Sequence, residues 1–123
     1  ESIFTRFDYR DLALARAVDI FQPDLAICGG ITEAMRIAAL ATSHQIRLAP
    51  HMWGGAIMFA AGLHICATAP AAFIVEYSLG HNPLMHDLVA ENFPVVDGRI
   101  EVSDRPGLGL TIDTDFVRAH AVS

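Results

Sequence analysis

The sequence predicts an α/β fold built from a few strand–helix units, and three observations predict it. Short runs rich in β-branched and aromatic residues alternate with alanine-rich segments of helical spacing, and the connections between them are short. Such alternation is typical of βαβ units and a parallel sheet. About three units are too few for an open sheet covered on both faces, but they match part of a closed barrel of roughly 250 residues.

The chain is predicted to begin with a capped helix followed by a strand. Asp8 is expected to cap a helix over residues 9–17, which carry two leucines and three alanines. The β-favouring run 18–21 follows, and Pro23 ends regular pairing there because proline lacks the backbone donor.

The second strand–helix unit is predicted from a glycine pair. Gly29 and Gly30 indicate a tight turn before a helix that Thr32 caps and that ends at Gln45. Helical spacing predicts that its apolar residues are buried and that Glu33 and Arg36 are exposed. Residues 46–49 are the next predicted strand.

The second half begins with the longest apolar stretch, residues 52–72. Glycines, His64 and Pro70 interrupt it, whereas a membrane span needs about 20 continuous apolar residues, so a buried helix over 54–68 is predicted. A β-favouring run covers 71–77. After Gly80, residues 93–102 predict a hairpin around Asp97-Gly98, and 113–120 a short helix. Residues 1–80 are therefore assigned to βα units and 81–123 to a C-terminal extension.

Composition narrows the class of protein. With 123 residues the chain has the length of one domain, and 53% hydrophobic residues with a mean hydropathy of +0.39 predict large covered surfaces, consistent with a homo-oligomer. A net charge of −6 without any lysine argues against nucleic acid or a membrane surface as partner. Two cysteines give no disulfide framework and favour the cytoplasm. The start at Glu1, with neither initiator methionine nor signal peptide, suggests that upstream residues are missing.

Ionisable residues follow the predicted strands. Asp24 and His51 end two successive apolar runs, and Glu1 and Glu76 take the equivalent places in the neighbouring units. Parallel strands would place all four at one rim, where barrel enzymes carry their chemistry. A carboxylate beside an imidazole fixes its tautomer and makes a general base. The alternative is that Asp24 caps a turn and His51 is an unrelated loop residue.

Several motifs together extend this interpretation. In chain order they are Val18-Asp19-Ile20-Phe21-Gln22-Pro23-Asp24, Gly29-Gly30-Ile31-Thr32-Glu33-Ala34, Ala49-Pro50-His51, Glu76-Tyr77, Asn82-Pro83-Leu84, Asp97-Gly98 and Pro106-Gly107-Leu108-Gly109. Over essentially the whole chain, the sequence resembles the C-terminal part of enolase-superfamily enzymes of the mandelate racemase/muconate lactonizing group. The resemblance implies an incomplete modified TIM barrel, (β/α)7β, whose C-terminal extension packs on a capping domain absent from this chain.

The resemblance also implies roles for individual residues. His51 would be the general acid/base and Asp24 its orienting partner, since their spacing of 27 positions matches the family's dyad. Glu1, 23 positions before Asp24, would be one ligand of Mg²⁺. Glu76 would bind the substrate carboxylate, although its distance from His51 requires an insertion of about five residues relative to the family. Trp53 would line the substrate pocket or pack at the rim.

The implied reaction is Mg²⁺-dependent abstraction of the proton α to a carboxylate through an enediolate. The flanking motifs resemble those of enzymes acting on sugar acids, so dehydration of an aldonate or aldarate is the leading hypothesis. A racemase, an epimerase or a cycloisomerase is the nearest alternative, and a non-catalytic fragment is another. The other metal ligands and the second, lysine base would lie upstream, so the chain alone is expected to be inactive.

Overall fold

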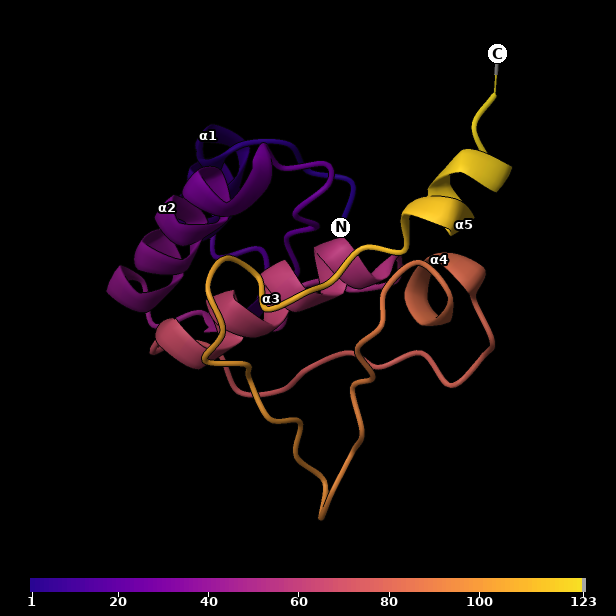
Figure 1. The fold of residues 1–123 in the computed structure, drawn as a ribbon. Coiled ribbons are helices and arrows are strands. Elements are labelled where there is room, and N and C mark those ends of the chain that lie inside the picture. Colours follow the sequence, from indigo (N-terminus) through magenta and orange to yellow (C-terminus); the bar gives the residue numbers. More distant parts are fainter. Residues whose placement is uncertain (123) are drawn as a thin grey trace.

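The computed structural model describes residues 1–122. Its helices and strands alternate as far as Thr68. The later part of the chain has two short helices and long irregular segments (Figure 1). In chain order the elements are α1 (Arg6–Leu14), β1 (Ile20–Phe21), α2 (Gly30–Ser43), β2 (Arg47–Leu48), α3 (Ala56–Thr68), α4 (Pro83–His86) and α5 (Thr114–Ala119).

The sheet is short and parallel. β1 pairs with β2, with Ile20 opposite Arg47 and Phe21 opposite Leu48. A third segment joins the other edge of β2 through a parallel bridge between Leu48 and Ala72. Parallel strands joined by crossover helices confirm the predicted α/β class.

The strand predicted over residues 71–77 is wrong in extent. The Leu48 amide donates to the Ala71 carbonyl at 2.8 Å, and the Phe73 amide donates to the Leu48 carbonyl at 3.3 Å. Beyond Phe73 the segment makes no further ladder with the described residues, and both Phe73 and Ile74 are exposed. A β-favouring run forms a strand only where a second backbone lies alongside it.

Both predicted caps in the first half are wrong. Thr5 takes the N-cap position of α1 without a side-chain hydrogen bond, so Asp8 lies inside the first turn. α2 begins two residues before Thr32, because Gly29 takes the N-cap position with a φ of 111°. This left-handed backbone suits glycine, which has no Cβ to clash, and it lets the chain turn sharply from the strand end into the helix.

Glu33 was predicted to be exposed but is buried between two helices. Its carboxylate accepts a hydrogen bond from the Arg6 amide at 2.9 Å and forms an ion pair with the Arg6 guanidinium at 2.6 Å. Arg36 adds a second ion pair at 3.2 Å. These contacts hold the pKa of Glu33 below its ordinary value, chiefly through the Arg6 amide. The carboxylate thus joins the start of α1 to α2.

The main core lies between the sheet and the helices α1, α2 and α3 (Figure 1). Phe21 and Leu48 extend from the strands into it, and Ile37 meets them from α2. α3 is buried along most of its length, as predicted for the apolar stretch. Within residues 1–122, none of the helices combines the length and apolar character needed to cross a membrane.

The C-terminal extension has less regular structure. Between α4 and α5 the chain extends as a long, narrow loop (Figure 1). The predicted hairpin is reduced to its turn, in which Val96 and Arg99 exchange two backbone hydrogen bonds of 2.9 Å. Asp113 caps α5 through the amides of Asp115 and Phe116, which confirms the predicted terminal helix. α4 was not predicted.

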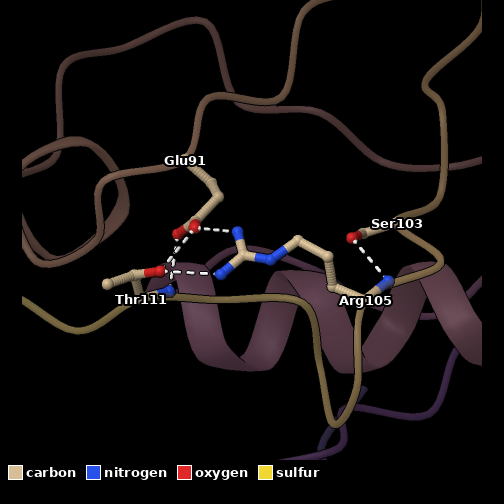
Figure 2. Close-up of polar contacts among 4 residues, drawn as sticks. All are labelled: Glu91, Ser103, Arg105 and Thr111. Carbon is tan, nitrogen blue, oxygen red and sulfur yellow. Dashed lines mark hydrogen bonds and ion pairs between the residues drawn. The ribbon is translucent and has the colours of Figure 1, made fainter.

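One cluster of polar side chains links three segments of the C-terminal extension (Figure 2). The Glu91 carboxylate accepts hydrogen bonds from the Thr111 amide at 2.7 Å and the Thr111 hydroxyl at 2.9 Å, and it pairs with the Arg105 guanidinium. The Thr111 amide, followed by Arg105, lowers the pKa of Glu91 to about 2. Three segments separated by up to 20 positions therefore meet at one carboxylate.

Candidate active site

The register of the sheet brings Asp24 and His51 together. Each β1 residue lies opposite the β2 residue 27 positions later, and the isolated parallel bridge between Asp24 and His51 continues this offset past the strands. The amide of His51 donates to the carbonyl of Pro23 at 3.1 Å. The spacing of 27 positions between Asp24 and His51 therefore equals the offset between paired residues of the two strands.

The two side chains form a direct pair. Nδ1 of His51 lies 2.8 Å from Oδ2 of Asp24, and the other oxygen of Asp24 accepts from the Ala26 amide at 2.7 Å. Asp24 is 5% exposed. With its carboxylate fixed from both sides, Asp24 holds the imidazole in one orientation and assigns the proton to Nδ1. Nε2 is left as the nitrogen that can exchange a proton with a bound molecule.

Glu1 lies on the Nε2 side of the ring. Its Oε2 is 3.3 Å from Nε2 of His51, and its side chain is 59% exposed. A carboxylate is a hard oxygen ligand, which suits Mg²⁺. Within residues 1–122 no group of three potential ligands is arranged to hold a metal ion. Glu1 therefore offers donor chemistry that would fit a hard divalent cation.

Glu76 and Trp53 complete the predicted set. Oε2 of Glu76 accepts a hydrogen bond of 2.8 Å from the amide of Met52, the residue after His51. Trp53 comes next in the chain, and 69% of its surface is exposed. The structure thus places Asp24 and Glu1 each in contact with His51 and links Glu76 to His51 through the backbone of Met52.

Two buried residues near Asp24, Tyr9 and Cys28, were not assigned to the site from the sequence. Tyr9 and Cys28 belong to the main core, and burial raises the pKa of both side chains. The charge of Asp24 contributes to both shifts. Tyr9 was expected only as a residue of the first helix, and no motif distinguishes it from an ordinary core aromatic. The Met52 amide was also missed, because a backbone donor leaves no trace in the sequence.

Comparison with known proteins shows the family. The model of the family described as "Enolase C-terminal domain-like" matches residues 1–116. The chain belongs to this family, which confirms the predicted partial, modified TIM barrel.

The curated relatives include a cycloisomerase and several dehydratases. D-galactarolactone cycloisomerase of Agrobacterium fabrum is 40% identical over 109 residues, covering 82% of this chain and 29% of that protein. D-galactonate dehydratase of Xanthomonas oryzae pv. oryzae is 37% identical over 124 residues, covering 96% of this chain and 32% of that protein. The chain spans about a third of the length of these relatives.

A solved structure agrees in fold. The mandelate racemase/muconate lactonizing enzyme-like protein of Rubrobacter xylanophilus superposes with a TM-score of 0.86 and 39% sequence identity. The match covers 98% of this chain and 31% of that one.

Proposed function

We propose that this chain supplies the histidine side of an active site that removes the proton α to a carboxylate of a sugar acid. The observation that carries the proposal is the His51–Asp24 pair, with Nδ1 held 2.8 Å from Oδ2 of Asp24 and Nε2 facing the carboxylate of the exposed Glu1. A histidine fixed in this way is a general base of the type such reactions require.

The roles of the residues follow from their contacts. Nε2 of His51 takes the α-proton, while Asp24 accepts the Nδ1–H hydrogen bond and stabilises the imidazolium that forms. Glu76 lies three residues beyond the segment that pairs with β2, where Oε1 can meet a substrate oxygen while Oε2 keeps its bond to the Met52 amide. Trp53 offers an exposed aromatic face for the carbon chain of the substrate.

We also propose that Mg²⁺ is the cofactor and that Glu1 is one of its ligands. When bound, such an ion would supply positive charge against the negative charge that builds up on the substrate carboxylate as the α-proton leaves. The carboxylate oxygen of Glu1 and its exposure support this role. The remaining ligands and an opposing base are expected from other parts of the barrel.

Dehydration is the preferred outcome. After the α-C–H bond breaks, the β-C–O bond breaks and hydroxide leaves with a proton as water. The resulting enol then tautomerises to a 2-keto-3-deoxy acid. The 37% identity to D-galactonate dehydratase over nearly the whole chain supports this reaction.

Cycloisomerisation is the second candidate. The 40% identity to D-galactarolactone cycloisomerase favours it, and the same proton abstraction would begin it. A racemase or an epimerase shares this first step as well. The reactions differ in the fate of the enediolate once it has formed, and the described residues serve all of them.

The experiment is the replacement His51→Asn in the full-length protein, assayed with Mg²⁺ and a library of aldonates, aldarates and their lactones. We expect activity to fall by about 100- to 10,000-fold, because general acid–base catalysis contributes that much. His44→Asn, at the exposed end of α2, is the matched control and should retain activity.

Product analysis in D₂O separates the two candidates. A 2-keto-3-deoxy product supports dehydration, whereas deuterium at Cα without loss of water supports cycloisomerisation, racemisation or epimerisation. Full activity of His51→Asn would refute the proposed mechanism.

A further inference from the structure

The loop between β2 and α3 carries Trp53, whose orientation depends on the backbone around it. Trp53 is 69% exposed, so the packing of its own ring restrains it little. One residue before it, the amide of Met52 donates to the Glu76 carboxylate at 2.8 Å. One residue after it, the carbonyl of Gly54 accepts a hydrogen bond of 3.0 Å from Nδ2 of Asn82. Two side chains from the segment after the sheet therefore hold the loop on both sides of Trp53.

Asn82 is also fixed at its other end. It is the N-cap of α4, and its Oδ1 accepts a hydrogen bond of 3.0 Å from the amide of Leu84. The oxygen of this side-chain amide thus meets a donor while its nitrogen meets an acceptor. Turning the group by 180° would place like groups against each other at both ends, so only one orientation satisfies it. One half-buried side chain joins the start of α4 to the Trp53 loop.

The backbone of α4 lies directly against the same loop. A Cβ placed on Gly55 would lie 3.1 Å from the carbonyl oxygen of Leu84 and 3.2 Å from its Cβ, so a side chain at this position would press on α4. Met85 of α4 is buried in one cluster with Met52 and Phe59. A displacement of α4 would therefore be transmitted to the loop.

We propose that Asn82 is a positioning residue that sets Trp53 against the carbon chain of the sugar acid and so contributes to the choice of substrate. Its donor to the Gly54 carbonyl prevents the backbone after Trp53 from rotating, as the Glu76 carboxylate does for the backbone before it. The effect on the substrate rests on the proposed function, whereas the restraint of the loop does not.

His51 is the competing route for such an effect, because it lies at the start of the same loop. Its imidazole is held by Asp24 at 2.8 Å, and its amide donates to the Pro23 carbonyl at 3.1 Å. Neither contact involves Asn82 or Gly54. Loss of the Asn82 donor should therefore change the binding of substrate and leave the general base in place.

The positioning role is tested by kinetics of Asn82→Asp in the full-length protein, with the aldonate, aldarate or lactone that the parent converts fastest. Aspartate caps a helix as well as asparagine does, so the Tm should stay close to that of the parent. The variant loses the donor to Gly54, and we expect KM to rise about 2- to 10-fold with kcat unchanged, as for the loss of one hydrogen bond. Asn92→Asp adds the same charge at an exposed position and should keep the parental KM. An unchanged KM, or a fall in kcat instead, would overturn the proposal.

A double-mutant cycle shows whether Asn82 acts through Trp53. Residues that act through one another have non-additive effects. In a Trp53→Ala background, Asn82→Asp should therefore raise KM no further. A rise as large as in the parent would place the effect elsewhere and overturn the assignment.

The restraint of the loop is tested by ¹⁹F NMR on the full-length protein labelled with 5-fluorotryptophan. Loss of one resonance in Trp53→Phe assigns the signal. We expect Asn82→Asp to shift or broaden this resonance and Asn92→Asp to leave it in place. An unchanged Trp53 resonance in Asn82→Asp would overturn the restraint. This measurement requires no enzymatic activity, so its failure differs from failure of the proposed function.

Discussion

The chain contains two regions that are held together by different interactions. In residues 1–80, parallel backbone pairing sets Asp24 opposite His51 beside the main core. In residues 81–122 the helices are short, and the Glu91 carboxylate joins its own segment to those of Arg105 and Thr111. Asp24 and His51 lie in the first region, where strand register determines their separation.

The difference shows where precision is needed. A base must remain within a fraction of an ångström of its partner, and backbone pairing achieves this because every neighbouring residue restrains the same offset. The extension makes fewer backbone pairs, so it tolerates irregular structure. The division into these two regions as separate units remains a prediction.

The largest expected effect on stability comes from the core beneath the pair. Phe21 is 1% exposed, and Phe21→Ala should destabilise the protein by about 3–5 kcal/mol because it removes a buried ring and leaves a cavity. Phe116→Ala makes the same change in α5, which has no buried residues, and should cost far less. Denaturant unfolding of the two variants measures the contrast, and equal losses would contradict it.

The next effect depends on pH. The pKa of Glu91 is lowered to about 2, so its stabilisation is fully present above its ordinary value near 4.5 and is lost as the pH falls through about 2. Glu91→Gln should therefore lower the Tm of the protein at pH 6, and the difference from the parent should shrink toward pH 2. Glu101→Gln, an exposed carboxylate in the same loop, is the control. A pH-independent difference for Glu91→Gln would argue against an ionic role.

The smallest effect should be local. Asp113 caps α5 by accepting from the amides of Asp115 and Phe116, both at 2.9 Å. Asp113→Ala should destabilise this helix by about 1 kcal/mol. Amide hydrogen exchange should rise over α5 while the Tm of the whole protein stays constant. A large drop in Tm would show that α5 is coupled to the main core more strongly than its exposure indicates.

Much of the fold and of the pair could be predicted from the sequence. Alternating helical and β-favouring segments predicted the α/β class, and the spacing of 27 between Asp24 and His51 equals the register that the structure shows. The short helix predicted over residues 113–120 is confirmed, because its signal is local. Family resemblance added the roles of Glu1, Glu76 and Trp53, which remain predictions.

The wrong predictions share a physical cause: the structure at each of these positions depends on residues distant in the sequence. Glu33 is buried because Arg6, 27 positions earlier, supplies both an amide and a guanidinium. Residues 71–77 lack a full ladder because strand formation requires a neighbouring backbone. The Tyr9 hydroxyl is buried without a hydrogen-bond partner among the described residues, and this property arises only when the chain has folded.

The hydrogen bond from Met52 to Glu76 has a consequence for the entropy of substrate binding. A free glutamate side chain loses up to about 2 kcal/mol of conformational freedom when it is fixed in one geometry. Because the Met52 amide already holds Oε2 at 2.8 Å, most of that loss occurs during folding. A ligand that reaches Oε1 therefore meets a carboxylate whose rotamer has been selected in advance, and more of its interaction energy is retained as affinity.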